Sequence, residues 1–244
     1  TRERMYAAEP RRADVSAGAS LVIDPPECFS VADILAVLYL EIFQHKPGHP
    51  AWPGRDRFIL AKISAWPLYG FLLHRLGYFS AEEAEPADMN DLPGLDFPPA
   101  PPGIGLSAAA GFATGFRMDG RGNRVFALLG RGELHSGRTW EAAARAGDEK
   151  LSRLCAVIDF CSDSRAPSRE ETEQCTALAE KFRIFGWESL VVDGHALDEL
   201  RYAFSKFNKS AAPKPFVLIA RTIRGKGSPL AEETREELGR NRHG

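Results

Sequence analysis

The second half of the chain alternates between short, continuously apolar runs and longer stretches with apolar residues at helical spacing. Two helical stretches, REETEQCTALAEKFRIFG and ALDELRYAFSKFN, separate runs that have the length and composition of strands covered on both faces. The predicted strands are RVFALLG, LCAVIDF, ESLVVDG and KPFVLIARTIRG. Strands that alternate with helices indicate an α/β fold, in which a parallel β-sheet is sandwiched by helices.

The first half of the chain predicts helices and one long loop. SVADILAVLYLEIF predicts a helix with Ser30 as its N-cap. ISAWPLYGFLLHRLG predicts a second helix, begun or kinked at Pro67 and ended by Gly77. GLSAAAGFATGFRM predicts a third, whose small residues suit close packing. Residues 81–105 are acidic and then rich in proline, which predicts a surface loop of a length that is often functional.

Composition indicates one large domain, which we place at residues 21–230, between a polar leader (1–20) and a C-terminal tail (231–244). The chain has 244 residues, 44% of them hydrophobic and 26% charged. Its net charge of -2 gives no reason to expect nucleic acid or an anionic membrane as partner. No apolar run approaches the roughly 20 residues of a membrane span. The leader lacks the apolar core of a signal peptide, so we expect a cytoplasmic chain, with its four cysteines as buried, reduced thiols.

The carboxyl ends of the predicted strands are the places where a parallel sheet binds its ligands. These ends are Gly130–Glu133, Asp159–Ser164, Asp193–His195 and Arg221–Lys226. At the first of them, a strand, a glycine turn and an alanine-rich helix suit a phosphorylated ligand, and the backbone N–H groups that open the helix would add to the anion site. A Gly-x-Gly turn also suggests a dinucleotide site, but the third glycine of that motif is missing here.

Several of these segments, in this order, resemble the N-terminal, diphosphate-binding half of transketolase. More closely, they resemble the separate N-terminal subunit of split transketolases, from about Ser20 to Gly227. The segments are DILAVLYLEIFQHKPGHPAWPGRDRFILAK, GIGLSAAAGFATG, VFALLGRGELHSGRTWEAA, FGWESLVVDGH and RTIRGKG. The resemblance implies a thiamine diphosphate-binding fold, thiamine diphosphate as cofactor, and ketol or acyl transfer from a small-molecule substrate.

The metal-binding motif of this family is altered in the chain. Family members hold a divalent metal through Gly-Asp-Gly and an Asn at the end of the next strand. Gly130 and Gly132 match the glycines, but the Asp position is Arg131 and the Asn position falls on Cys161. A guanidinium and a thiol are poor substitutes for the oxygen ligands of a hard cation. The resemblance therefore argues against a bound divalent metal.

Other positions depart from the family in the same direction. Family histidines are replaced by Asp24 and Ser64, Pro102 stands for an apolar residue beside the thiamine ring, and Ser136 replaces an acidic residue. These replacements predict a substrate other than the usual sugar phosphates, as in secondary metabolism. The tail residue His243 resembles a family histidine that neighbours the diphosphate.

Arg131 admits two interpretations. In the first, its guanidinium replaces the Asp–metal unit and binds the diphosphate directly, because an aspartate with a divalent metal carries one net positive charge, as an arginine does. In the second, Arg131 is a drifted surface residue in a site that binds nothing. The chain would then be a non-catalytic scaffold or regulatory subunit.

The remaining candidate residues follow from the strand ends and the family motifs. The predicted cofactor-binding residues are Gly103, Gly105, Gly130, Arg131, Gly132, Glu133, Cys161 and His195, and the catalytic candidates are His135 and Glu141. Cys161 is expected to be a semi-buried thiol rather than a metal ligand or nucleophile. His195 is expected to cap the next helix or to line the edge of the site. Arg224 and Lys226 are either solvated charges or a source of positive potential for an anionic ligand.

The resemblance also implies a partner. In this family the aminopyrimidine ring of the cofactor is activated by a glutamate on a second domain, which these segments do not include. We therefore expect a C-terminal transketolase-like subunit that carries the pyrimidine-binding domain, in an α2β2 hetero-oligomer.

Overall fold

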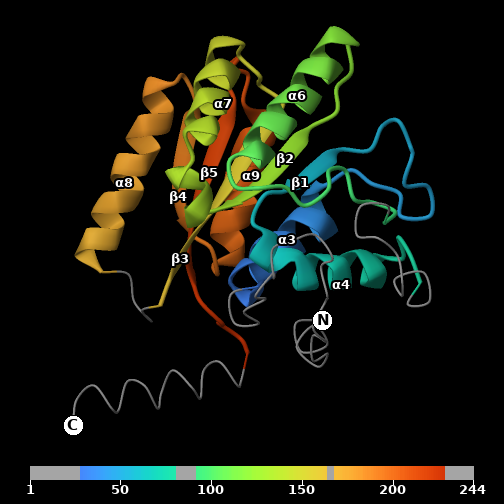
Figure 1. Cartoon of the computed structure of the whole chain (residues 1–244), viewed down its shortest axis with the longest axis horizontal. Coiled ribbons are helices and arrows are strands. Elements are labelled where there is room, and N and C mark those ends of the chain that lie inside the picture. Colours follow the sequence, from blue (N-terminus) through green and yellow to red (C-terminus); the bar gives the residue numbers. More distant parts are fainter. Residues whose placement is uncertain (1–27, 81–91, 164–167, 229–244) are drawn as a thin grey trace.

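Five parallel strands form the single sheet of the computed structural model, which describes residues 28–80, 92–163 and 168–228 (Figure 1). Their order is β1-β2-β3-β5-β4. The bounds are β1 Arg57–Leu60, β2 Val125–Gly130, β3 Leu154–Ser162, β4 Glu188–Asp193 and β5 Phe216–Ile223. The predicted leader and tail lie outside the described residues, as do Asp24 and His243.

Helices cover both faces of this sheet, which confirms the predicted fold class. One face packs against α6 (Ile104–Met118), α7 (Gly137–Asp148) and α8 (Arg169–Ile184), and the other against α3 (Ala32–Val37), α4 (Trp66–Leu76) and α9 (Leu197–Lys209) (Figure 1). Shorter helical turns are η1 Phe29–Val31, η2 Leu38–Ile42, η3 Ile63–Ala65 and η4 Arg131–His135. Within the part of the chain that the structure describes, no helix has the length and apolar character needed to cross a bilayer.

The strand β2 shows why the predicted strands are continuously apolar. All six of its residues are buried. Phe126 and Leu128 pack on the side of α3, α4 and α9, whereas Ala127 and Leu129 pack under α6 and α7. A strand covered on both faces favours apolar side chains at successive positions, because a buried polar group needs a partner within the chain. The four predicted strands are confirmed, but the sequence pattern did not predict β1, a short strand that pairs with β2.

The helix termini confirm one prediction and correct another. Helix α4 begins at Trp66 with Pro67 in its first turn, and it ends before Gly77, which adopts φ 85°. The prediction of Ser30 as an N-cap is wrong. Ser30 lies inside η1, and its buried hydroxyl donates to the Asp159 carboxylate at 2.7 Å instead. Without a donor the buried carboxylate would carry its full desolvation penalty, which accounts for the direction of the hydroxyl.

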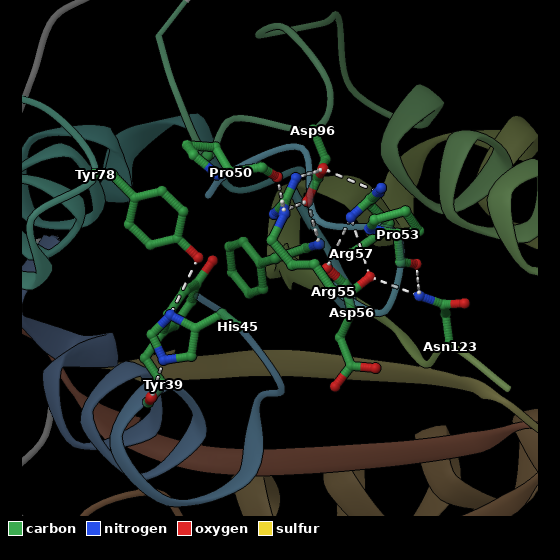
Figure 2. Close-up of polar contacts among 12 residues, drawn as sticks. Tyr39, His45, Pro50, Pro53, Arg55, Asp56, Arg57, Tyr78, Asp96 and Asn123 are labelled. Atoms are coloured by element: carbon green, nitrogen blue, oxygen red, sulfur yellow. Dashed lines mark hydrogen bonds and ion pairs between the residues drawn. The ribbon is translucent and has the colours of Figure 1, made fainter. Parts of the chain in front are cut away.

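A network of buried charges joins the loop before α6 to the amino end of β1 (Figure 2). The Asp96 carboxylate accepts hydrogen bonds from the Arg55 guanidinium, at 3.0 Å for one of the pairs, and from the Phe58 backbone N–H at 2.9 Å. The Arg57 Nε lies 3.3 Å from it. Burial raises the pKa of Asp96, against the opposing effect of Arg55. The network fixes the described part of the predicted loop, residues 92–103, against the sheet.

A second buried pair lies beside it, directly before β2. The Arg124 guanidinium donates to the Asp56 carboxylate, at 3.0 Å from Nε and 2.5 Å from a terminal nitrogen. It also donates to the Asn208 side chain and to the Ile42 carbonyl, both at 2.6 Å. These contacts link β2 to α9 and to the end of η2.

Candidate functional site

A pocket of about 270 Å³ lies at the carboxyl ends of β1, β2 and β3. Lys62 and Ser64 follow β1, Gly130 and Gly132 form the turn after β2, and Cys161 belongs to the end of β3; all of them line the pocket. The sequence predicted the ends of β2 and β3 as ligand sites. The predicted end at Asp193–His195 contributes no residue to the lining.

The floor of the pocket is a carboxylate whose hydrogen-bonding capacity is taken by the chain itself. Asp159 Oδ2 accepts from Lys62 Nζ at 2.5 Å and from Ser30 Oγ at 2.7 Å, and its Oδ1 accepts from the Thr222 hydroxyl. The side chains of Lys62 and Asp159 are 4% and 0% exposed. This set of donors neutralises the carboxylate and leaves it unsuited to bind a metal.

Arg131 begins η4, directly after β2, and lies at the entrance of the pocket. Its guanidinium stacks over the Phe160 ring, 4.3 Å from the centroid. It donates to the Cys161 carbonyl at 3.4 Å and to the Gln174 side-chain oxygen at 3.5 Å. Both bonds are at the long limit of hydrogen-bond geometry, and both acceptors are neutral. The guanidinium is therefore held between the ends of β2 and β3 while its side chain remains exposed.

Arg131 differs from the other cations of the pocket in its hydrogen-bond and ion-pair partners. Lys62 pairs with Asp159, and Arg224 lies 3.6 Å from Asp163. The remaining lining carboxylate, Glu133, is buried and accepts from the Gly103 N–H at 2.6 Å. Burial raises the pKa of Glu133. Arg131 is thus the cation of the described lining whose hydrogen bonds go to neutral groups, and its charge is available to an anion.

The predicted glycines fall into two groups. Gly103 adopts φ +90°, and a Cβ there would lie 2.0 Å from the Ser136 hydroxyl; a Cβ on Gly105 would lie 2.3 Å from the Cβ of Ala61. Neither residue lines the pocket, and both allow the start of α6 to pack closely. Gly132 is different, because nothing lies within 4 Å of an added Cβ. The turn after β2 therefore faces open space.

The histidine and glutamate candidates lie away from the pocket lining. His135, at the end of η4, and Glu141, on α7, are both exposed. The side chain of His195 is buried. Its Nε2 accepts from the Ile223 N–H at 2.9 Å, which places the proton on Nδ1, where it is donated to Asp33 at 2.9 Å. The prediction that His195 caps the next helix is wrong, because Ala196 is the N-cap of α9. His195 joins the end of β5 to α3.

Cys161 lines the pocket as a neutral thiol. Burial, and to a lesser degree the Asp159 carboxylate, raise the pKa of the thiol to about 11, so it is protonated at neutral pH. Only the thiolate is a good nucleophile or metal ligand. Among the described residues no group of three or more His, Cys, Asp or Glu side chains is placed to hold a metal. The three lining carboxylates have partners within the chain: Asp159 contacts Lys62, Asp163 lies 3.6 Å from Arg224, and Glu133 accepts from the Gly103 N–H. With its cations and a neutral thiol, this lining suits a phosphorylated ligand better than a divalent cation.

Two features of the site differ from the sequence analysis. The helix directly after β2 is η4, whose Gly132 and Glu133 line the pocket, whereas α7 begins only at Gly137 and contributes no lining residue. The contribution of helix N–H groups to an anion site stays a prediction. Lys62 and its contact with Asp159 were missed. Recognising β1 would have revealed Lys62, because it is a polar residue two positions after the end of that strand.

Comparison with known proteins agrees with this geometry. Residues 23–241 match the family model described as transketolase, thiamine diphosphate binding domain. The chain is 33% identical over 214 residues to the 6-deoxy-6-sulfo-D-fructose transketolase subunit SqwG of Clostridium sp. (strain MSTE9). This match covers 83% of the chain and 78% of that subunit. It is 34% identical over 222 residues to human transketolase, which covers 86% of this chain but only 35% of that protein.

The fold has the same relatives. The crystal structure of transketolase from Campylobacter jejuni superposes with a TM-score of 0.69 at 25% identity, over 85% of this chain and 38% of that one. These matches confirm the resemblance seen in the sequence motifs. The chain belongs to the transketolase family, to its thiamine diphosphate-binding domain.

Proposed function

We propose that the pocket binds the diphosphate of thiamine diphosphate without a divalent metal, with the Arg131 guanidinium in the metal's place. The observation that carries this proposal is the position of Arg131 between the ends of β2 and β3, with long hydrogen bonds to neutral groups only. A planar guanidinium suits phosphoryl oxygens bidentately. Stacking on Phe160 orients it at little entropic cost.

The surrounding residues take supporting roles. Arg224 lines the same pocket and adds positive charge, with Asp163 3.6 Å away. Lys62 and Asp159 form a rigid, neutral floor. Glu133 holds the Gly103 turn, the start of the glycine segment that lies along the cofactor in the family. When bound, thiamine diphosphate supplies a nucleophilic carbon that cleaves and forms C–C bonds next to a carbonyl group.

We further propose that the chain is the N-terminal subunit of a two-component, cytoplasmic transketolase-like transferase. Its relative SqwG is named as a transketolase subunit, and this chain spans 78% of it. The other component would be a C-terminal subunit with the pyrimidine-binding domain, in an α2β2 assembly. Ser64 stands at a family histidine position on the pocket lining, which favours a substrate of secondary metabolism over the common sugar phosphates.

Calorimetric titration of thiamine diphosphate in the presence of EDTA tests the arginine substitution, with the chain alone and mixed with the C-terminal subunit. We expect binding without metal. Arg131→Gln should weaken it by about 10- to 100-fold, because a hydrogen bond to a charged phosphate contributes about 1.5–3 kcal/mol. The matched control is Arg145→Gln, an exposed arginine of α7 that does not line the pocket.

Two outcomes would contradict the proposal. Binding that requires Mg²⁺, or that Arg131→Gln leaves unchanged, would remove the role of the guanidinium. No binding by the unaltered chain, with or without metal and partner, would establish the alternative, a non-catalytic scaffold subunit.

A further inference from the structure

A second hollow, of about 180 Å³, lies at the amino ends of β2 and β3, whereas the candidate pocket lies at their carboxyl ends. It is formed by the end of α6 and by the turns that lead into β2 and β3. Its apolar surface comes from Ala113, Phe116 and Leu151, and its cations are Arg117, Arg121, Lys150 and Arg153. No carboxylate is among its described lining residues, whereas the candidate pocket has one carboxylate for every cation.

Two of these arginines are held in place by the chain. Arg121 donates to the Pro53 carbonyl at 2.6 Å, and its guanidinium lies 5.3 Å from the centroid of the Phe116 ring. Arg117 donates to the Glu149 carboxylate at 2.9 Å, which neutralises it. No carboxylate of the described chain forms an ion pair with Arg121, Lys150 or Arg153. The hollow therefore keeps a positive charge although the whole chain has a net charge of -2.

Lys150 has an unusual backbone. Its φ of 54° is the one positive value at a non-glycine residue of the described chain. The turn is fixed by hydrogen bonds from the Lys150 N–H to the Gly147 carbonyl at 2.9 Å and from the Ser152 N–H to the Lys150 carbonyl at 2.8 Å. Glycine would adopt this conformation without strain. Here the conformation ends helix α7, since the Leu151 N–H also donates to the Ala146 carbonyl at 3.1 Å, and the residue at this left-handed position is a cation that lines the hollow.

We propose that this hollow binds the phosphoryl group of a small metabolite whose apolar part lies on Phe116 and Leu151. Clefts lined by one sign of charge concentrate the electrostatic potential, and guanidinium groups suit phosphoryl oxygens. The small volume favours a small molecule over a protein segment. This site is independent of the Arg131 proposal, because the two share no residue.

The test is a titration with two probes, inorganic phosphate and phenyl phosphate, followed by ¹⁵N amide NMR. Arg131→Gln is the background, so that binding in the candidate pocket is weakened, and the positions of the shifted amides distinguish any remaining binding there from binding in the hollow. We expect shifts at residues 120–124 and 147–153, and tighter binding of phenyl phosphate because of the apolar surface. In that background, the double substitution Arg121→Gln and Arg153→Gln should weaken binding at least about tenfold.

The controls separate this site from general attraction to positive charge. Lys214→Gln removes an exposed cation outside the hollow and should leave binding unchanged. Lys150→Gly removes the strain of a positive φ, so we expect this variant to fold. Introduced alone into the Arg131→Gln background, it should weaken phosphate binding. An equal loss of phosphate affinity in Lys214→Gln, or amide shifts confined to residues outside the hollow, would overturn the proposal. Binding of a hexaglutamate peptide but not of phenyl phosphate would also overturn it and would assign the hollow to a protein partner.

Discussion

Two arginines flank the same strand, and their surroundings differ completely. Arg124 precedes β2, is 8% exposed, and gives hydrogen bonds to Asp56, Asn208 and the Ile42 carbonyl. Arg131 follows β2, is exposed, and gives two long bonds to neutral acceptors. A guanidinium whose donors are saturated by the chain is part of the fold. One whose donors are underused at a strand end is available to a ligand.

The first prediction tests this contrast at the level of stability. Arg124→Ala should lower the free energy of unfolding by about 3–5 kcal/mol, because it leaves the Asp56 carboxylate buried without its counter-ion. Arg131→Ala should change it by less than about 0.5 kcal/mol, as for other surface substitutions. Urea unfolding of both variants measures the difference. Similar losses in the two would show that Arg131 is also a structural residue.

The second prediction compares two glycines of the site. Gly103→Ala should cost about 1–3 kcal/mol, because its φ is positive and the new Cβ would meet Ser136. Gly132→Ala should leave the thermal midpoint nearly unchanged, since a Cβ there meets nothing within 4 Å. It should nevertheless weaken the binding of thiamine diphosphate, because the methyl group enters the open space after β2. An unaltered affinity would place the ligand elsewhere.

The third prediction concerns the second hollow, which Lys150 lines. Lys150→Gly should stabilise the chain by about 1 kcal/mol, because glycine removes the strain of a positive φ. The same change should weaken phenyl phosphate binding, so stability and affinity should move in opposite directions. Thermal unfolding with and without phenyl phosphate measures both. A loss of stability would mean that the Lys150 side chain supports the fold.

The smallest predicted effect is a pH dependence from Glu133. Burial raises its pKa, so the folded chain holds this proton more tightly than the unfolded chain does. The contribution of Glu133 to stability is therefore present at low pH and is lost as the pH rises through the folded pKa. Glu133→Gln should be more stable than the unaltered chain at pH 7, and the two should converge in acid. A Gln variant that is less stable at every pH would show that the Gly103 contact needs the charge.

The sequence predicted the layers of the fold because burial on both faces leaves a clear signal. The run Val125–Gly130 is apolar throughout, Leu154–Ser162 is apolar up to Asp159 near its carboxyl end, and the lengths of both match strands. The pattern failed at β1, since Arg57–Leu60 is too short and too close to charges to stand out, and its pairing with β2 decides its structure.

The site was only partly predictable from the sequence, because some of its contacts join residues that are far apart along the chain. Arg131 and Cys161 were found from strand ends and family motifs, and both line the pocket. The contact between Lys62 and Asp159 joins residues 97 positions apart, and nothing local indicates it. Ser30 shows the converse, since a local capping preference gave way to a hydrogen bond with a residue 129 positions away.

The strand order has a consequence for how the chain assembles during synthesis. β5 lies between β3 and β4 although it is made last, so β3 and β4 each present an open hydrogen-bonding edge until residues 216–223 leave the ribosome. Unpaired edges template association with other chains. A nascent chain arrested before Phe216 would therefore be the species of this protein most prone to aggregate.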